Sequence, residues 1–252
     1  MSSLPSRSRP LPARPRLPAS LADQVYTAVR DAIVHGQFAP GDKLVELDIA
    51  AWMGTSQGPV REALQRLERD GLVERRARSA TYVTAIAADE IYELFAIRSL
   101  IEGFAIRRAL PRIGPAQLAE LDDLLEAMRA AGQRDDMRDL VSCDMLFHRR
   151  ICEWSGSAVL LRTWLPPYSQ IQRYVAQHHR GYFGDLVVVA NTHAPIIAAI
   201  RQGDPAAAAR VIQDHIMLIW SSVQPQGEAG NDKRHTLKMT DITSEPPFDN
   251  VL

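Results

Sequence analysis

Apolar residues recur every three or four positions along most of the chain, which is the pattern of helices that bury one face. Near the N-terminus this pattern predicts three short helices, at about residues 21–35, 46–53 and 57–69. The first ends at Gly36, a residue suited to a helix C-terminus. The third has Pro59 in its first turn, where a missing N–H loses no helical partner, and Ser56 is its predicted N-cap.

Two short runs with β-branched residues follow the third helix, at 72–74 and 81–84, and a basic turn joins them. Three helices and a two-stranded wing predict a winged helix-turn-helix. From Asp89 onward the pattern is almost purely helical, with about six segments at 91–105, 118–128, 137–154, 157–175, 185–201 and 205–222. The predicted fold class is therefore mainly α, an N-terminal winged helix-turn-helix plus a C-terminal all-α helical bundle.

The two ends of the chain differ in composition from these patterned regions. Residues 1–19 hold five prolines and four arginines and no acidic residue, and the stretch after about Pro225 is similar in kind. We therefore divide the chain into a disordered arm (1–19), a winged helix-turn-helix domain (20–86), an all-helical domain (88–223) and a disordered tail (224–252).

Composition narrows the class of protein. The 252 residues are 46% hydrophobic and 23% charged, which is ordinary for a soluble globular protein. No apolar run approaches the roughly 18 residues that a membrane span requires, and the N-terminal arm lacks the apolar core of a secretory signal. We therefore expect a cytoplasmic protein without a membrane partner. Cys143 and Cys152 lack metal-site spacing and are expected to be buried, reduced thiols.

The charge is uneven along the chain, although its formal net value is only −1. Residues 1–87 carry 12 Lys and Arg against 9 Asp and Glu. If the third helix turns Val60 and Leu64 inward, its polar face is free to enter the major groove of DNA. Arginine and glutamine there can form paired hydrogen bonds to base edges, and further arginines suit phosphates. The predicted contacts to double-stranded DNA are Ser56, Gln57, Gly58, Arg61, Gln65, Arg69, Arg76 and Arg78. The charge pattern by itself favours an ordinary solvated helix face, and it is the winged architecture that favours DNA contact.

Four polar residues occupy positions of the helical region that periodicity reserves for the core. Asp144 and His148 are four positions apart on one buried stripe, whereas His193 and His215 share the apolar faces of two later helices. Burying a carboxylate and three imidazoles is costly unless they meet one another or a cation. A single metal site resolves this cost, and its donors suit zinc first, with nickel, manganese or iron as alternatives. Each histidine taken alone would instead be assigned to the core or the surface as a hydrogen-bonded side chain.

Arg98 lies on the apolar stripe of the first helix of this region and so faces the same interior. A buried guanidinium needs an anionic partner, and Glu102, one turn on, can supply it. The alternative partner is the carboxylate of a small hydroxy, sugar or dicarboxylic acid. We predict such an effector, bound by Arg98 and Asn191. His178 and His179 lie in a polar segment and are expected at the surface.

The segment GTSQGPVREALQRLERDGLV (54–73) resembles the head domain of the GntR family of bacterial transcription regulators. The turn, the proline, the Arg-Glu pair and the wing come in the family's order over about residues 20–86. The family usually has an arginine and a threonine where this chain has Gln57 and Gly58, and a wing glycine where it has Ala80. The resemblance therefore implies a DNA-binding head, but the family's operator sequence is not carried over to this chain.

The helical region resembles the FCD effector domain of the GntR subfamily typified by the fatty-acid regulator. Metal-binding members carry D-x-x-x-H on one helix and single histidines on two later helices, in the order of Asp144, His148, His193 and His215. This resemblance spans about residues 89–222 and implies an effector domain that binds a metal ion.

These features favour a ligand-responsive transcription regulator that binds a palindromic operator as a homodimer. Repression is the commoner behaviour of the family, so we expect a repressor. A metal-dependent hydrolase is the alternative from another class. The chain has no HExxH motif and no glutamate placed as a general base, so we assign no catalytic residue and do not expect an enzyme. A third hypothesis is a DNA-binding regulator whose metal is purely structural.

Overall fold

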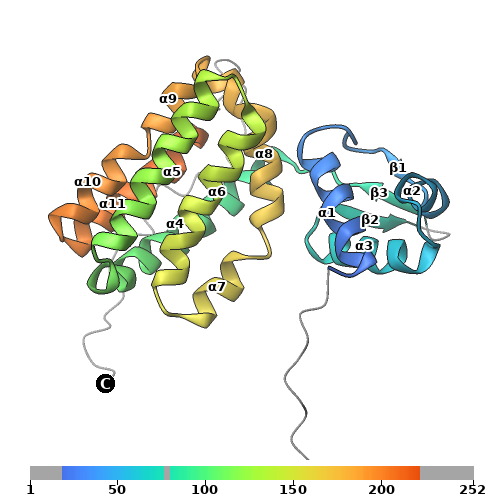
Figure 1. Cartoon of the computed structure of the whole chain (residues 1–252), viewed down its shortest axis with the longest axis horizontal. Coiled ribbons are helices and arrows are strands. Elements are labelled where there is room, and N and C mark those ends of the chain that lie inside the picture. The colour runs from blue at the N-terminus through green and yellow to red at the C-terminus, as the bar shows by residue number, and fades with distance from the viewer. Residues whose placement is uncertain (1–18, 77–79, 222–252) are drawn as a thin grey trace, which may run out of the picture.

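The computed structural model describes residues 19–76 and 80–221, which fold around two hydrophobic cores (Figure 1). The first core belongs to an N-terminal head, and the second belongs to a helical domain. Arg78, the predicted tail (224–252) and nearly all of the predicted arm (1–19) lie outside the described residues.

Three helices of the head lie where the sequence predicts them. They are α1 (Leu21–Val34), α2 (Glu46–Met53) and α3 (Gln57–Arg69). The left-handed backbone of Gly54 (φ 61°) ends α2. Ser56 is the N-cap of α3, although its hydroxyl makes no capping hydrogen bond. The apolar face of α3 is fully buried and packs on α1, so its polar face turns away from the core.

A small antiparallel sheet completes the head. Strands β2 (Val73–Arg76) and β3 (Ala80–Val83) form the predicted wing. A third strand that the sequence analysis missed, β1 (Lys43–Leu44), pairs with the other edge of β3. Two residues are too few to carry a periodic signal. The wing is thereby tied to the segment that leads into α2.

The second region is the predicted all-α bundle. Its helices are α4 (Ala88–Ala109), α5 (Pro115–Gln133), α6 (Met137–Trp154), α7 (Ala158–Trp164), α8 (Tyr168–Phe183), α9 (Leu186–Asn191), α10 (Ala194–Gln202) and α11 (Pro205–Ser221). Helix α4 packs along α11, and α5 packs along α6 (Figure 1). Cys152 is buried in this core, Cys143 is half-buried, and both are free thiols.

Two of the predicted helices are each broken by proline. The segment predicted as one helix at 157–175 is divided into α7 and α8 at Pro166 and Pro167. The segment predicted at 185–201 is divided into α9 and α10, because Pro195 has no N–H to donate to the carbonyl four residues earlier. The prediction of single helices was wrong at both places. The second break puts His193 at the start of α10.

Helix α8 joins the helical domain to the head. Arg30 of α1 donates from Nε to Ser169 Oγ at 3.2 Å and also bonds Gln172. Arg173 donates from Nη1 to the carbonyl of Thr84, just after the wing, at 2.9 Å. Two parts of the head, α1 and the residue that follows the wing, are thus hydrogen-bonded to α8.

No single helix in the described ranges combines the length and the hydropathy that crossing a membrane takes. Helix α8 and the segment 186–202 reach this length and hydropathy only when they are taken together, by length and composition alone. The two are bent by 110° at the break between them.

Candidate metal centre and DNA-binding face

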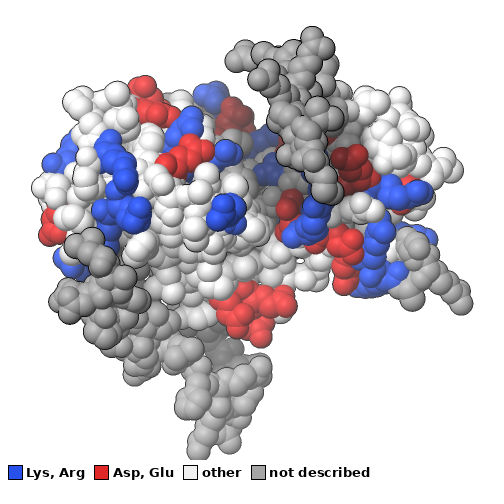
Figure 2. All heavy atoms as spheres, turned by 90° about the horizontal axis from the view of Figure 1, so that it is seen from below, with Lys and Arg blue, Asp and Glu red and all other residues white. Residues whose placement is uncertain are grey.

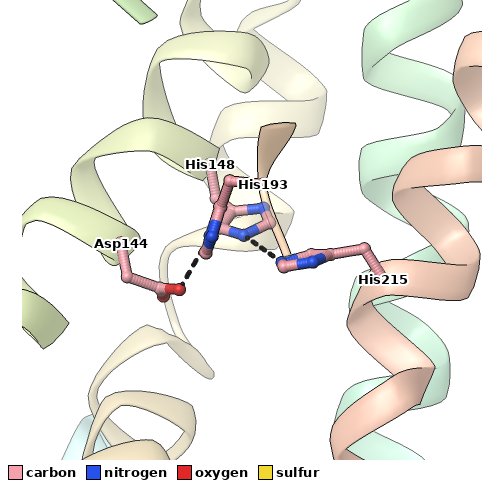
Figure 3. A group of neighbouring side chains, drawn as sticks. All are labelled: Asp144, His148, His193 and His215. Atoms are coloured by element: carbon pink, nitrogen blue, oxygen red, sulfur yellow. Dashed lines mark hydrogen bonds and ion pairs between the residues drawn. The ribbon is translucent and has the colours of Figure 1, made fainter. Parts of the chain in front are cut away.

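The four side chains predicted as metal ligands meet inside the helical domain (Figure 3). Asp144 and His148 come from α6, His193 from the start of α10, and His215 from α11. One ligand-type atom from each residue lies within 4.8 Å of those of the other three. The set is held by three separate helices, so its geometry depends on how these helices pack.

The approaches within the cluster are close. His193 Nε2 lies 2.9 Å from Asp144 Oδ1, and His148 Nε2 lies 3.2 Å from His215 Nε2. The ring centroids of His193 and His215 are 4.3 Å apart. Figure 3 shows the rings and the carboxylate turned toward one another.

Hydrogen bonds on the outer edge of two rings fix where their protons lie. His148 Nδ1 donates to Glu102 Oε2 at 2.5 Å, and His193 Nδ1 is 3.2 Å from the carbonyl of Ala190. With a proton on each Nδ1, the lone pair of each Nε2 faces the centre of the cluster. Lone pairs and a carboxylate that converge without a cation repel one another. The residues therefore fit a divalent metal ion.

The charges of the cluster agree with this fit. Burial lowers the pKa of His148 and holds the pKa of His215 well below its ordinary value, so both rings favour the neutral form that binds metals. Burial opposes ionisation of Asp144, but the neighbouring His193 outweighs it, and the pKa of Asp144 falls below its usual range. The cluster thus offers one negative charge, from Asp144, and two rings that favour the neutral form, those of His148 and His215.

Glu102 of α4 hydrogen-bonds His148 on the side of the ring that faces away from the cluster. This contact was not predicted from the sequence. Glu102 is fully buried, and its Oε1 accepts from Arg98 Nε and from Trp164 Nε1, each at 2.7 Å. Burial would raise the pKa of Glu102, but Arg98 and His148 lower it to about 2. The spacing of Arg98 and Glu102 indicated their ion pair, whereas the contact with His148 depends on how α4 packs on α6.

A small pocket lies beside the cluster. It is lined by Asp144, His179, Phe183, Val189, Thr192, His193, His215 and Leu218. The expectation that His179 lies at the surface was wrong, since the side chain is 1% exposed. Helix α8 continues to Phe183, which places His179 two turns beyond Ile171 on the buried face. Burial lowers the pKa of His179 to about 4. His178 is only half-buried and stacks on Tyr174.

The two residues predicted to bind an effector are not among those that line this pocket. Arg98 is buried, with its Nε paired to Glu102, and its Nη2 has no hydrogen-bond partner. Asn191 is exposed, and its Oδ1 accepts from Arg129 Nε at 2.8 Å, although the next residue, Thr192, lines the pocket.

The predicted DNA contacts that the structure describes lie on the exposed surface of the head. They are Ser56, Gln57, Gly58, Arg61, Gln65 and Arg69 on α3 and Arg76 on β2. Arg61 Nη2 pairs with Glu46 Oε2 of α2 at 2.9 Å, and Arg76 Nη2 pairs with Glu74 Oε1 at 2.6 Å. Figure 2 shows basic and acidic side chains intermixed at this end of the molecule. The exposed arginines are thus oriented by carboxylates, and the face carries no unbroken positive field.

Both regions of the chain match known families. Residues 21–83 match the family described as bacterial regulatory proteins, gntR family, and residues 93–217 match the FCD domain. A relative from Paenarthrobacter nicotinovorans, named as a probable D-xylose utilization operon transcriptional repressor, is 32% identical over 78% of this chain and 86% of its own length. The transcriptional repressor RspR of Escherichia coli K12 is 27% identical over 83% of this chain and 91% of its own length.

Solved structures share the same architecture. McbR/YncC of E. coli has a TM-score of 0.66 and 24% identity over 81% of this chain and 98% of that chain. A GntR regulator from Rhodococcus sp. RHA1 also has a TM-score of 0.66, at 23% identity over 79% of this chain and 97% of that chain. At these identities the likeness shows the fold, a winged head followed by a helical domain.

Proposed function

This chain belongs to the GntR family of bacterial transcription regulators and carries an FCD domain, and we propose that a small carboxylate bound beside a metal ion controls its affinity for DNA. Its family and relatives are DNA-binding regulators and not enzymes. The observation that carries the proposal is the convergence of Asp144 and three histidines beside a pocket. Two relatives are named as repressors, so repression is the mode that we propose.

Zinc is the metal that we propose for the cluster. Three imidazoles and one carboxylate are donors that zinc binds in a tetrahedral arrangement, and no redox chemistry is required of a regulator. Nickel, manganese and iron accept the same donors and are the alternatives. His148, His193, His215 and Asp144 would hold the ion, and Glu102 would keep His148 in the tautomer that binds it.

Arg98 is the residue that we propose to hold the effector's carboxylate. Its guanidinium is buried in the same interior, and one of its terminal nitrogens lacks a partner. A buried donor without a partner costs about 1–3 kcal/mol, which an anionic ligand would recover. The part of Asn191 in effector binding stays a prediction.

The variant Arg98→Lys should lose the effector response but keep the metal and DNA. A lysine can still neutralise Glu102, yet it lacks the second nitrogen that would reach a ligand. We expect the effector to bind at least about tenfold more weakly, by isothermal titration of the metal-loaded protein. Unchanged effector affinity in Arg98→Lys would make Arg98 structural, and Arg149, Arg162 and Arg173 would be tested next.

Helix α8 is the element that we propose to link the pocket with the head. Its C-terminal half supplies His179 and Phe183 to the pocket. Its N-terminal half holds Arg30 and the carbonyl of Thr84 in the head. A ligand that favours one position of α8 therefore favours one position of the head, and DNA affinity changes by the ligand's differential affinity for the two states.

An exposed face of α4 supports a homodimer. Ile97, Leu100 and Phe104 are 48%, 45% and 56% exposed and follow one another at helical spacing. Glu93 and Arg107, both exposed, each lie seven residues from Leu100 on the same face. If a second copy packs antiparallel about a two-fold axis at Leu100, each Glu93 meets the other copy's Arg107. The face is thus complementary to itself, and this is the surface that we propose for dimerisation.

The variant Leu100→Glu should be monomeric at micromolar concentration, because it places two carboxylates together at the axis of the dimer. Sedimentation velocity measures the change in mass. Val159→Glu is the matched control, since Val159 is an apolar residue of α7 that is 62% exposed and lies off this face. A Leu100→Glu protein that stays dimeric would move the dimer interface elsewhere.

A thermal-shift panel of small organic acids tests the proposed function. The metal-loaded protein should be stabilised by at least one acid, and the chelator-treated protein by none. Stabilisation by the metal alone, with no response to any acid, would favour the regulator with a purely structural metal.

A further inference from the structure

His179 is a buried imidazole to which the proposed function gives no task. It is 1% exposed, and neither ring nitrogen has a hydrogen-bond partner within the part of the chain that the structure describes. Phe183, one turn on, meets the ring edge-on with centroids 5.7 Å apart. A buried polar group without a partner is destabilising, so a side chain of this kind indicates an absent ligand or water.

The pocket determines what kind of group His179 can meet. Among the described residues its lining contains no lysine or arginine, and the one carboxylate is that of Asp144 in the metal cluster. Thr192 also lines the pocket, but its hydroxyl already donates to the carbonyl of Val189 at 2.6 Å. An imidazole buried without an anionic partner is uncharged, so it offers one N–H donor and one acceptor nitrogen. No lysine or arginine among the described lining residues could neutralise a second anion here, so the group that we expect to face His179 is an uncharged oxygen.

We propose that His179 hydrogen-bonds an uncharged oxygen, a hydroxyl or a carbonyl, on a small monocarboxylic acid whose carboxylate is the one proposed above to be held between the metal ion and Arg98. This inference rests on the proposed function. It adds a second contact that recognises the ligand, besides the contact with its carboxylate. Phe183, Val189 and Leu218 supply an apolar wall suited to a short carbon chain.

Matched acids that differ by one hydroxyl test this role. Isothermal titration of the full, zinc-loaded chain with 2-hydroxybutyrate and butyrate, and with glycolate and acetate, should show at least about tenfold tighter binding of each hydroxy acid, because a site that loses its hydrogen bond leaves a buried group unpaired. His179→Phe should bind both members of a pair equally and match the parent's affinity for the plain acid. His178→Phe is the control, since His178 lies beside His179 in the chain but stacks on Tyr174 outside the pocket.

A second measurement does not depend on the folding of a variant. In the parent protein, the ring nitrogen resonances of His179 should shift on addition of 2-hydroxybutyrate and stay in place on addition of butyrate. If the parent binds both acids of each pair equally, the inference about His179 is wrong, although the carboxylate site stands. If it binds none of the four acids, the proposed carboxylate site and the inference fall together.

Discussion

Replacing His215 by alanine is expected to remove the metal ion and much of the protein's thermal stability. His215 brings α11 to a cluster whose other members lie on α6 and α10, so the proposed ion would tie three helices together. Removing a side chain that only hydrogen-bonds to a metal ligand weakens metal binding about 10–100-fold. Removing the ligand itself should weaken metal binding more. At a thousandfold excess over the Kd, the ion stabilises the fold by about 4 kcal/mol, which corresponds to about 8–16 °C in Tm.

Elemental analysis and thermal melts with and without a chelator measure both effects. His178→Ala is the matched control, because it removes an imidazole from α8 without touching the cluster. The control should hold one ion per chain and melt like the parent. A parent protein without a divalent ion after exposure to zinc, or a His215→Ala variant that retains one equally tightly, contradicts the metal site.

Replacing Arg61 by alanine is expected to abolish specific operator binding while the head stays folded. Arg61 is exposed on the outward face of α3 and held by Glu46, an exposed pair that adds little to stability. A lost contact to a base edge costs about 1–3 kcal/mol. A dimer loses one contact in each half-site, so the total is about 2–6 kcal/mol.

Anisotropy titrations with the protein's own promoter DNA measure the loss, and circular dichroism checks the fold. Arg66→Ala is the matched control on the same helix, because Arg66 points back to α1, where it pairs with Asp23 at 2.5 Å and lies over Tyr26. Affinity that is unchanged in Arg61→Ala but lost in Arg66→Ala would show that a different face of the head meets DNA.

The head could be predicted from sequence because its signals are local. Glycines end α1 and α2, the proline-containing turn begins α3, and one apolar stripe orients it. Strand β1 was missed because its two residues are positioned by pairing with β3, a contact between segments far apart in sequence. The breaks at Pro166 and Pro195 had a local signal, which the apolar periodicity around them obscured.

The clustering of Asp144 with the three histidines could be predicted because each of these polar residues interrupts an apolar face, and burying them is costly unless they meet one another or a cation. The supporting contacts of the cluster could not be predicted in this way. The bond from His148 to Glu102 joins two helices whose packing no local pattern specifies. The burial of His179 had a signal in its spacing from Ile171 and Val175, but the predicted helix ended at residue 175.

The most direct test of the account is the operator affinity of the full protein, measured by anisotropy with metal bound, with and without a small carboxylate that the thermal-shift panel identifies. We predict that the acid changes the Kd for operator DNA at least about tenfold, and that the change disappears after chelation or in His215→Ala. An operator Kd that is the same with and without the acid, in protein shown to hold both metal and acid, would contradict the account.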